Sequence, residues 1–91
     1  MIEAIKRAKK YLQLDTYSRA VLVMQLKLDG FTKEVAEYAA DNCGVDWNDQ
    51  AVRTARRYCK QHLTGEELIS QLRFEQFTQA QAEYAVSKIT Q

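Results

Sequence analysis

The chain has 91 residues, 46% of them hydrophobic and 27% charged, which is enough for one domain or two very small ones. Thirteen basic against twelve acidic residues leave a net charge of +1, so the molecule as a whole has no strong electrostatic preference for nucleic acid or membrane. Proline is absent, glycine occurs three times, and no apolar stretch approaches the roughly 20 residues of a membrane-spanning helix.

Three helices are predicted for the first half of the chain, over residues 2–14, 18–29 and 32–42. In the first helix, apolar residues such as Ala4 and Ala8 return one helical turn apart. Ser18 and Thr32 are suited to cap the second and third helices, because their hydroxyl groups can accept hydrogen bonds from free backbone N–H groups. Gly30 is placed to end the second helix in the left-handed conformation.

The second half predicts three more helices, over residues 47–61, 65–75 and 78–89. Asp46 is a good N-cap for the first of them. Thr64 with Glu67, and Thr78 with Gln81, have the spacing of capping boxes, in which the two side chains bond each other's backbone N–H groups. These signals fix where the last two helices begin.

The two halves repeat one another. A first set of residues recurs at identical spacing: Ala4, Ala8 and Tyr11 return as Ala51, Ala55 and Tyr58. A longer set recurs after the loss of one residue in between: Leu22, Gln25, Leu26, Phe31, Thr32, Ala36, Glu37, Tyr38 and Ala39 return as Leu68, Gln71, Leu72, Phe77, Thr78, Ala82, Glu83, Tyr84 and Ala85. We therefore predict an all-α fold of two tandem three-helix repeats, residues 1–45 and 46–91, whose helix-turn-helix-like hairpins pack together into one module.

The turns inside the two repeats differ at one position. Gln76 stands where Gly30 stands, and a left-handed conformation costs a non-glycine residue about 1 kcal/mol, so we expect a looser or differently shaped second turn. Trp47, at the junction, is predicted to be a core wedge between the copies. The aromatic residues predicted to be structural are Phe31, Trp47, Phe77, Tyr38 and Tyr84.

Few residues of this sequence are candidates for catalysis. Cys59 lies three residues before His62, but it replaces Leu12 of the first repeat, which predicts a core position rather than a reactive thiol. Cys43, Cys59 and His62 lack a fourth metal ligand at suitable spacing. Two buried free thiols are favoured over a Cys43–Cys59 disulfide. We expect no catalytic residue, no cofactor and no metal.

Charge is divided among the predicted helices. Basic residues gather in segments 1–10 and 51–60, whereas segments 11–50 and 61–91 are net acidic. One interpretation is solvated faces with pairing inside the molecule. The other is a basic face for phosphate-rich surfaces and an acidic face for a basic partner.

The predicted hairpins also allow a DNA-binding interpretation, because a helix-turn-helix places its second helix in the major groove. That helix would present Glu34, Glu37 and Asp41 in the first repeat, and these acids repel phosphate. A DNA-binding regulator therefore stays an alternative that the charge pattern disfavours. A cell-envelope scaffold that binds anionic polymer through the basic helices is another.

The sequence resembles a known family over nearly its whole length. The stretch 25–39, the Asp46-Trp47-Asn48 junction with Gln-Ala after it, and the second copy over 70–86 are similar to the repeat of the Ltp-like host cell surface-exposed lipoproteins. This resemblance implies a non-enzymatic domain of Gram-positive bacteria and their prophages that confers superinfection exclusion, blocking phage DNA injection by binding the phage tape measure protein.

The resemblance also bears on location and on the contact surface. Family lipoproteins begin with a signal peptide and a lipobox cysteine; we expect the outer face of the cell membrane if such a signal preceded this chain, and the cytoplasm otherwise. We further expect a monomer. A basic stretch of the partner is expected to meet an acidic face composed of Glu34, Glu37, Asp41, Asp46, Asp49 and Glu83.

Overall fold

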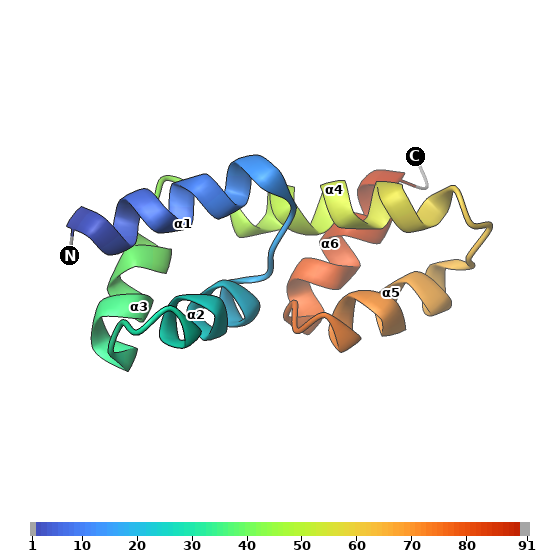
Figure 1. Cartoon of the computed structure of the whole chain (residues 1–91). Helices are drawn as coiled ribbons and strands as arrows, with labels where there is room; N and C mark the ends of the chain where they lie inside the picture. The colour runs from blue at the N-terminus through green and yellow to red at the C-terminus, as the bar shows by residue number, and fades with distance from the viewer. Residues whose placement is uncertain (1, 90–91) are drawn as a thin grey trace. The chain divides into compact units, whose positions relative to one another are not determined.

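The computed structural model describes residues 2–89 and consists there of six helices without a strand (Figure 1). The helices are α1 (Ile2–Leu14), α2 (Arg19–Leu28), α3 (Lys33–Asp41), α4 (Trp47–Cys59), α5 (Gly65–Phe74) and α6 (Gln79–Ile89). Each lies within the range predicted for it, which confirms the all-α fold. The predicted ranges were longer mainly because they counted the capping residues as helical.

The chain forms two compact units that divide between Val45 and Asp46. In the first unit, α1 packs on both α2 and α3. In the second, α4 packs most extensively on α6, and α5 contacts both. Trp47 is the first residue of α4 and is half-buried, and its role as a wedge between the copies stays a prediction.

The predicted caps account for the helix starts. The hydroxyl group of Ser18 accepts a hydrogen bond from the Val21 N–H (3.3 Å), and Thr32 and Asp46 act in the same way on α3 and α4. The Thr78 hydroxyl accepts from the Gln81 N–H (3.1 Å), while the Gln81 side chain accepts from the Thr78 N–H (3.0 Å). Thr64 forms the same reciprocal box at the start of α5. Both predicted capping boxes are confirmed.

The expected difference between the two internal turns is wrong. Gln76 adopts a left-handed conformation (φ 73°), as Gly30 does (φ 104°). The N–H of Phe77 donates to the Leu72 carbonyl group over 3.1 Å, and the equivalent hydrogen bond closes the first turn at 3.2 Å. Burying a phenylalanine gives roughly 2–3 kcal/mol, which exceeds the strain of about 1 kcal/mol at Gln76, so the turn keeps its shape.

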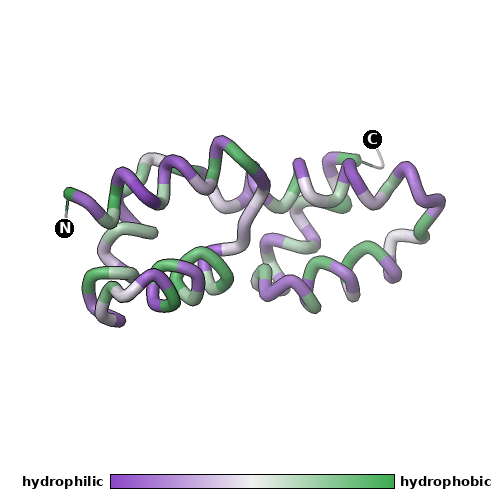
Figure 2. Tube along the Cα trace, viewed as in Figure 1, coloured by the Kyte–Doolittle hydropathy of each residue, from purple (hydrophilic) through white to green (hydrophobic). Residues whose placement is uncertain are grey.

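The two units have different cores. Phe77 is fully buried at 1% exposure, whereas its counterpart Phe31 is only half-buried. Small residues dominate elsewhere and allow close helix approach. Buried apolar residues of the first unit are Ala4, Ala8, Leu22, Leu26, Ala36, Ala39, Ala40 and Cys43, and those of the second are Ala51, Val52, Ala55, Leu68, Leu72, Phe77, Ala82 and Ala85. Figure 2 shows hydrophobic and hydrophilic stretches interspersed along each helix, and amphipathic helices have such a pattern because apolar residues return every three to four positions.

The two cysteines occupy different environments. Cys43 is buried, as predicted, and its thiol donates to the Ala40 carbonyl group at 3.4 Å. Cys59 is exposed, so its predicted core position is wrong. It is the last residue of α4, and the equivalent Leu12 is itself only half-buried, so this position lies at the edge of a repeat core rather than inside it. Both thiols are free.

Candidate partner-binding surface

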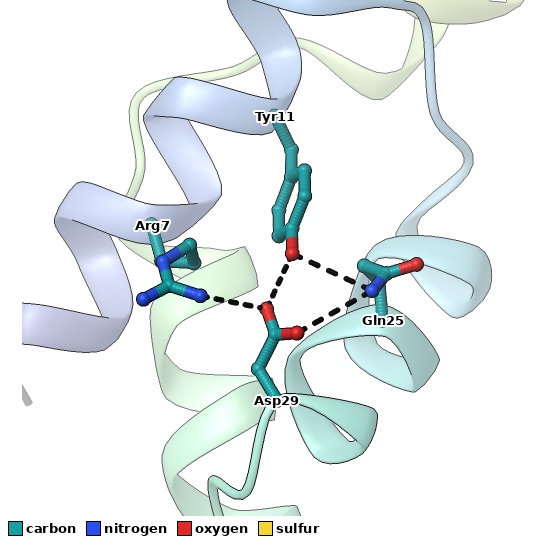
Figure 3. A network of polar contacts seen from close by, with 4 residues as sticks. All are labelled: Arg7, Tyr11, Gln25 and Asp29. Atoms are coloured by element: carbon teal, nitrogen blue, oxygen red, sulfur yellow. Dashed lines mark hydrogen bonds and ion pairs between the residues drawn. The ribbon is translucent and has the colours of Figure 1, made fainter.

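A polar network joins α1 to the end of α2 in the first unit (Figure 3). Asp29, the C-cap of α2, accepts a short hydrogen bond from the Tyr11 hydroxyl group and an ion pair from Arg7 at 3.2 Å. The Gln25 side-chain amide lies 3.4 Å from the Tyr11 oxygen and 3.5 Å from Asp29. The Tyr11 hydrogen bond, and then the charge of Arg7, lower the pKa of Asp29, which keeps this carboxylate ionised.

The second unit repeats the tyrosine, the glutamine and the acidic cap of this network, with a threonine at the position of Arg7. The Gln71 side-chain amide lies 3.4 Å from the Tyr58 hydroxyl group and 3.4 Å from Glu75, the C-cap of α5. The hydrogen bond to Glu75 raises the pKa of Tyr58. Thr54 takes the place of Arg7; it is buried and donates to the Gln50 carbonyl group at 2.8 Å.

This network gives a physical reason for two of the repeated identities. The tyrosine and the glutamine recur because together they hold the acidic cap that ends the second helix of each unit. Sequence reasoning missed the network, although an acidic residue just before each turn, Asp29 and Glu75, was a visible signal. The contacts of each network lie within one unit, so the arrangement stabilises the fold of that unit.

The acidic residues of α3 differ in their surroundings. Asp41 forms a two-pronged ion pair with Arg19 of α2, with N–O distances of 2.7 and 2.9 Å. Those hydrogen bonds lower the pKa of Asp41 and leave it less available to a partner. Glu34 is exposed in the first turn of α3, and Glu37 is half-buried. The hydrogen bond to Asp41 and, to a smaller extent, the charge of Glu37 raise the pKa of Arg19.

The acidic residues predicted from the second repeat also have partners in their own unit. Asp46 caps α4, Asp49 pairs with Arg53 one turn away at 2.8 Å, and Glu83 accepts from the Gln79 amide at 3.0 Å. The residues of the predicted acidic face therefore fall into two groups with different surroundings. Its α3 part retains exposed carboxylate charge at Glu34, whereas its second-repeat part is engaged in local contacts.

Two surface hollows are well defined among the described residues of the second unit. One, of about 460 Å³, lies along α5 and is lined by Leu63, Glu66, Glu67, Ser70 and Gln71. The other, of about 260 Å³, lies between α4 and α6 and is lined by Asp46, Asp49, Val52, Arg56, Tyr84 and Lys88. The hollow along α5 contains the Ser70 hydroxyl group and two carboxylates, of which Glu67 is already engaged in the capping box with Thr64.

Other predicted features can be placed as well. Within residues 2–89, no group of three or more histidine, cysteine or acidic side chains could hold a metal ion. His62 is exposed in the turn after α4, where its backbone N–H donates to the Cys59 carbonyl group at 3.1 Å. Across the same described residues, no helix has the length and apolar character needed to cross a membrane.

Comparison with known proteins gives two matches that agree. The family model described as host cell surface-exposed lipoprotein matches residues 2–43 and 46–89, one match for each unit. A solved structure, that of Ltp, a superinfection exclusion protein from the Streptococcus thermophilus temperate phage TP-J34, is 33% identical with a TM-score of 0.84. The similarity covers 93% of this chain and 90% of that one. No curated protein matches the sequence.

Proposed function

Because the chain belongs to the family of host cell surface-exposed lipoproteins, we propose that it is a non-enzymatic binding module that protects a bacterial cell from superinfection by a phage. The observation that carries this proposal is the similarity to a superinfection exclusion protein, which extends over both units at 33% identity.

The proposed partner is the phage tape measure protein, and the proposed place of action is the outer face of the cell membrane. Binding there would stop the delivery of phage DNA before it enters the cell. The family resemblance supports both points. A module of this kind needs only an exposed surface of complementary charge with a few apolar anchors.

We place the contact surface on α3. Glu34 and Glu37 carry carboxylate charge there, and Asp41 adds a third carboxylate that Arg19 partly neutralises. A basic stretch of the partner would be attracted to these side chains over a distance, which speeds its capture. Asp46, Asp49 and Glu83 contribute less in this proposal, because groups of their own unit already engage them.

Two measurements test the proposal together. The chain is displayed on a susceptible host through a lipoprotein signal, and phage adsorption and DNA entry are followed separately; we expect normal adsorption and blocked entry. In parallel, binding of purified tape measure protein is measured by interferometry. Unimpeded DNA entry at full display, or no binding at low salt, would refute it, and a steep salt-dependent gel shift with DNA would favour the regulator instead.

The surface assignment is tested with charge reversals. Changing Glu34, Glu37 and Asp41 to lysine should slow association and weaken its salt dependence while the helical circular dichroism signal persists. The double variant of Glu34 and Glu37 has a control of equal charge, which reverses Glu3 and Glu66, exposed on α1 and α5. Equal loss of association rate in both variants would show that only the total charge matters and not the α3 surface.

A further inference from the structure

Two exposed tyrosines occupy equivalent positions in the two units. Tyr38 of α3 is 44% exposed and Tyr84 of α6 is 41% exposed. The ammonium group of Lys88 lies over the ring of Tyr84, 5.3 Å from its centre. This geometry is a cation–π interaction, in which the negative face of the ring attracts a positive charge. The tyrosine of the second unit therefore already holds a cation.

The first unit has no such cation at the same place. The residue one turn after Tyr38 is Asn42, which corresponds to Lys88 in the repeat. The Asn42 side chain donates to the Tyr38 carbonyl oxygen at 2.8 Å, so it caps the end of the helix backbone. Within residues 2–89, a cation–π contact is present at Tyr84 and none is present at Tyr38. The face of the Tyr38 ring thus has no cation from the described part of the chain.

The charged residues on the helix around Tyr38 also favour a cation there, whereas the corresponding residues around Tyr84 do not. On a helix, residues three and four apart are neighbours, so Glu34 and Asp41 lie next to Tyr38. The corresponding neighbours of Tyr84 on its own helix are Ala80 and Ser87, which carry no charge. Carboxylates at the start of α4, Asp46 and Asp49, line the same hollow as Tyr84, but Arg56 and Lys88 line it as well and offset their charge. Arg19 holds Asp41 in place and compensates its charge, whereas Glu34 is exposed. Carboxylate charge beside an open aromatic ring favours a cation at that ring.

We propose that Tyr38, with Glu34 beside it, receives a lysine or arginine side chain of a protein partner on the face of its ring. The contact reproduces between molecules what Lys88 and Tyr84 form inside the second unit. The inference deepens the proposed function, since it names the chemistry by which a basic partner is recognised. It also makes the two units unequal: the first is open to a cation and the second is closed.

A short amidated peptide of alternating arginine and glycine tests this without any phage protein. It is titrated into the full chain at low salt while the ring resonances of both tyrosines are followed by NMR. We expect the Tyr38 ring signals to shift and saturate, and those of Tyr84 to stay. Tyr38→Phe keeps an aromatic face and should retain binding, whereas Tyr38→Leu should weaken it about two- to fivefold.

A second variant places a positively charged side chain of the same chain near Tyr38. Asn42→Lys places a lysine one turn after Tyr38, as in the second unit, and should weaken peptide binding about two- to fivefold beyond the effect of its charge alone. Ala20→Lys, on an exposed position of α2, is the control of equal charge. Conversely, Lys88→Asn should make the Tyr84 ring begin to respond.

Equal shifts at both tyrosines in the parent chain, or equal effects of Asn42→Lys and Ala20→Lys, would overturn the inference. These outcomes are independent of the proposed function, because the peptide contains no phage sequence. If the peptide binds at Tyr38 but tape measure protein does not bind the chain, the proposed function fails and the cation site stands. If tape measure protein binds the chain but the peptide does not shift the Tyr38 signals, the cation site is wrong and the proposed function stands.

Discussion

The two units share one helical plan but are stabilised differently. In the first, ion pairs join different helices: Arg7 to Asp29 between α1 and the end of α2, and Arg19 to Asp41 between α2 and α3. In the second unit, three of the four residues that form these pairs are replaced by uncharged ones. The replacements are Thr54 for Arg7, Gly65 for Arg19 and Ser87 for Asp41.

The second unit also differs in its core and its caps. Phe77 fills the space that Phe31 fills only partly, and both α5 and α6 begin with reciprocal capping boxes. The difference teaches that this repeat is specified by the placement of a few apolar residues and turn residues. Its surface charges can then change from copy to copy without loss of the fold, which leaves them free for binding.

The largest effect is expected in the core of the second unit. Phe77→Ala removes a fully buried ring and should lower the free energy of unfolding of this unit by about 3–5 kcal/mol. Phe31→Ala should cost clearly less, because Phe31 is half-buried. Denaturant titration combined with hydrogen exchange of each unit measures both. An equal cost would mean that the two cores are equivalent after all.

The caps should have a smaller effect. Thr78→Ala removes the hydroxyl group that accepts from the Gln81 N–H and should destabilise the second unit by about 1 kcal/mol. Thr78→Ser keeps that hydroxyl group and serves as the control. The measurement is the denaturant midpoint at constant slope. A cost below the experimental error would indicate that water replaces the cap.

The turns offer a reciprocal exchange. Gln76→Gly relieves the left-handed strain and should stabilise the second unit by up to about 1 kcal/mol, while Gly30→Gln should destabilise the first by a similar amount. Space is not the reason, since a Cβ atom added at Gly30 would meet no heavy atom within 4 Å. Thermal unfolding of both variants checks this, and unchanged transition temperatures would contradict it.

The smallest effect concerns pH. The pKa values of Asp29 and Asp41 are lowered in the folded first unit from an ordinary value of 3.8, so the folded state binds these protons less readily than the unfolded chain. Their stabilisation is therefore present above about pH 4 and is lost as the pH falls through the lowered values. The Asp41 side chain is 53% exposed and that of Asp29 is 17% exposed, so solvent screens mainly the Asp41 pair and the combined loss should be modest.

The double variant Asp29→Asn and Asp41→Asn should make the stability of the first unit less dependent on pH below about pH 4. Hydrogen exchange in the first unit between neutral pH and pH 3 provides the measurement. The control is Glu34→Gln, which changes an exposed carboxylate for which no ion pair is described. An acid response that survives in the double variant would assign it to other groups.

The sequence by itself determined the six helices, their starts and the repeat. Each of these depends on residues only a few positions apart: Ser18 meets Val21, and Thr78 meets Gln81, whatever the rest of the chain does. The same local signals, recurring in two copies, carried the resemblance to the lipoprotein family. The helix ends were less certain, because they depend on turn geometry.

Only the tertiary structure decided which polar groups meet across helices. The partners of Asp29 and Asp41 lie on other helices, and helix spacing along the chain does not fix how those helices cross. The same holds for burial, since Cys59 lies beyond the repeat core although its position in the repeat predicted otherwise. At Gln76, the burial of Phe77 outweighed a local preference that sequence reasoning had taken as decisive.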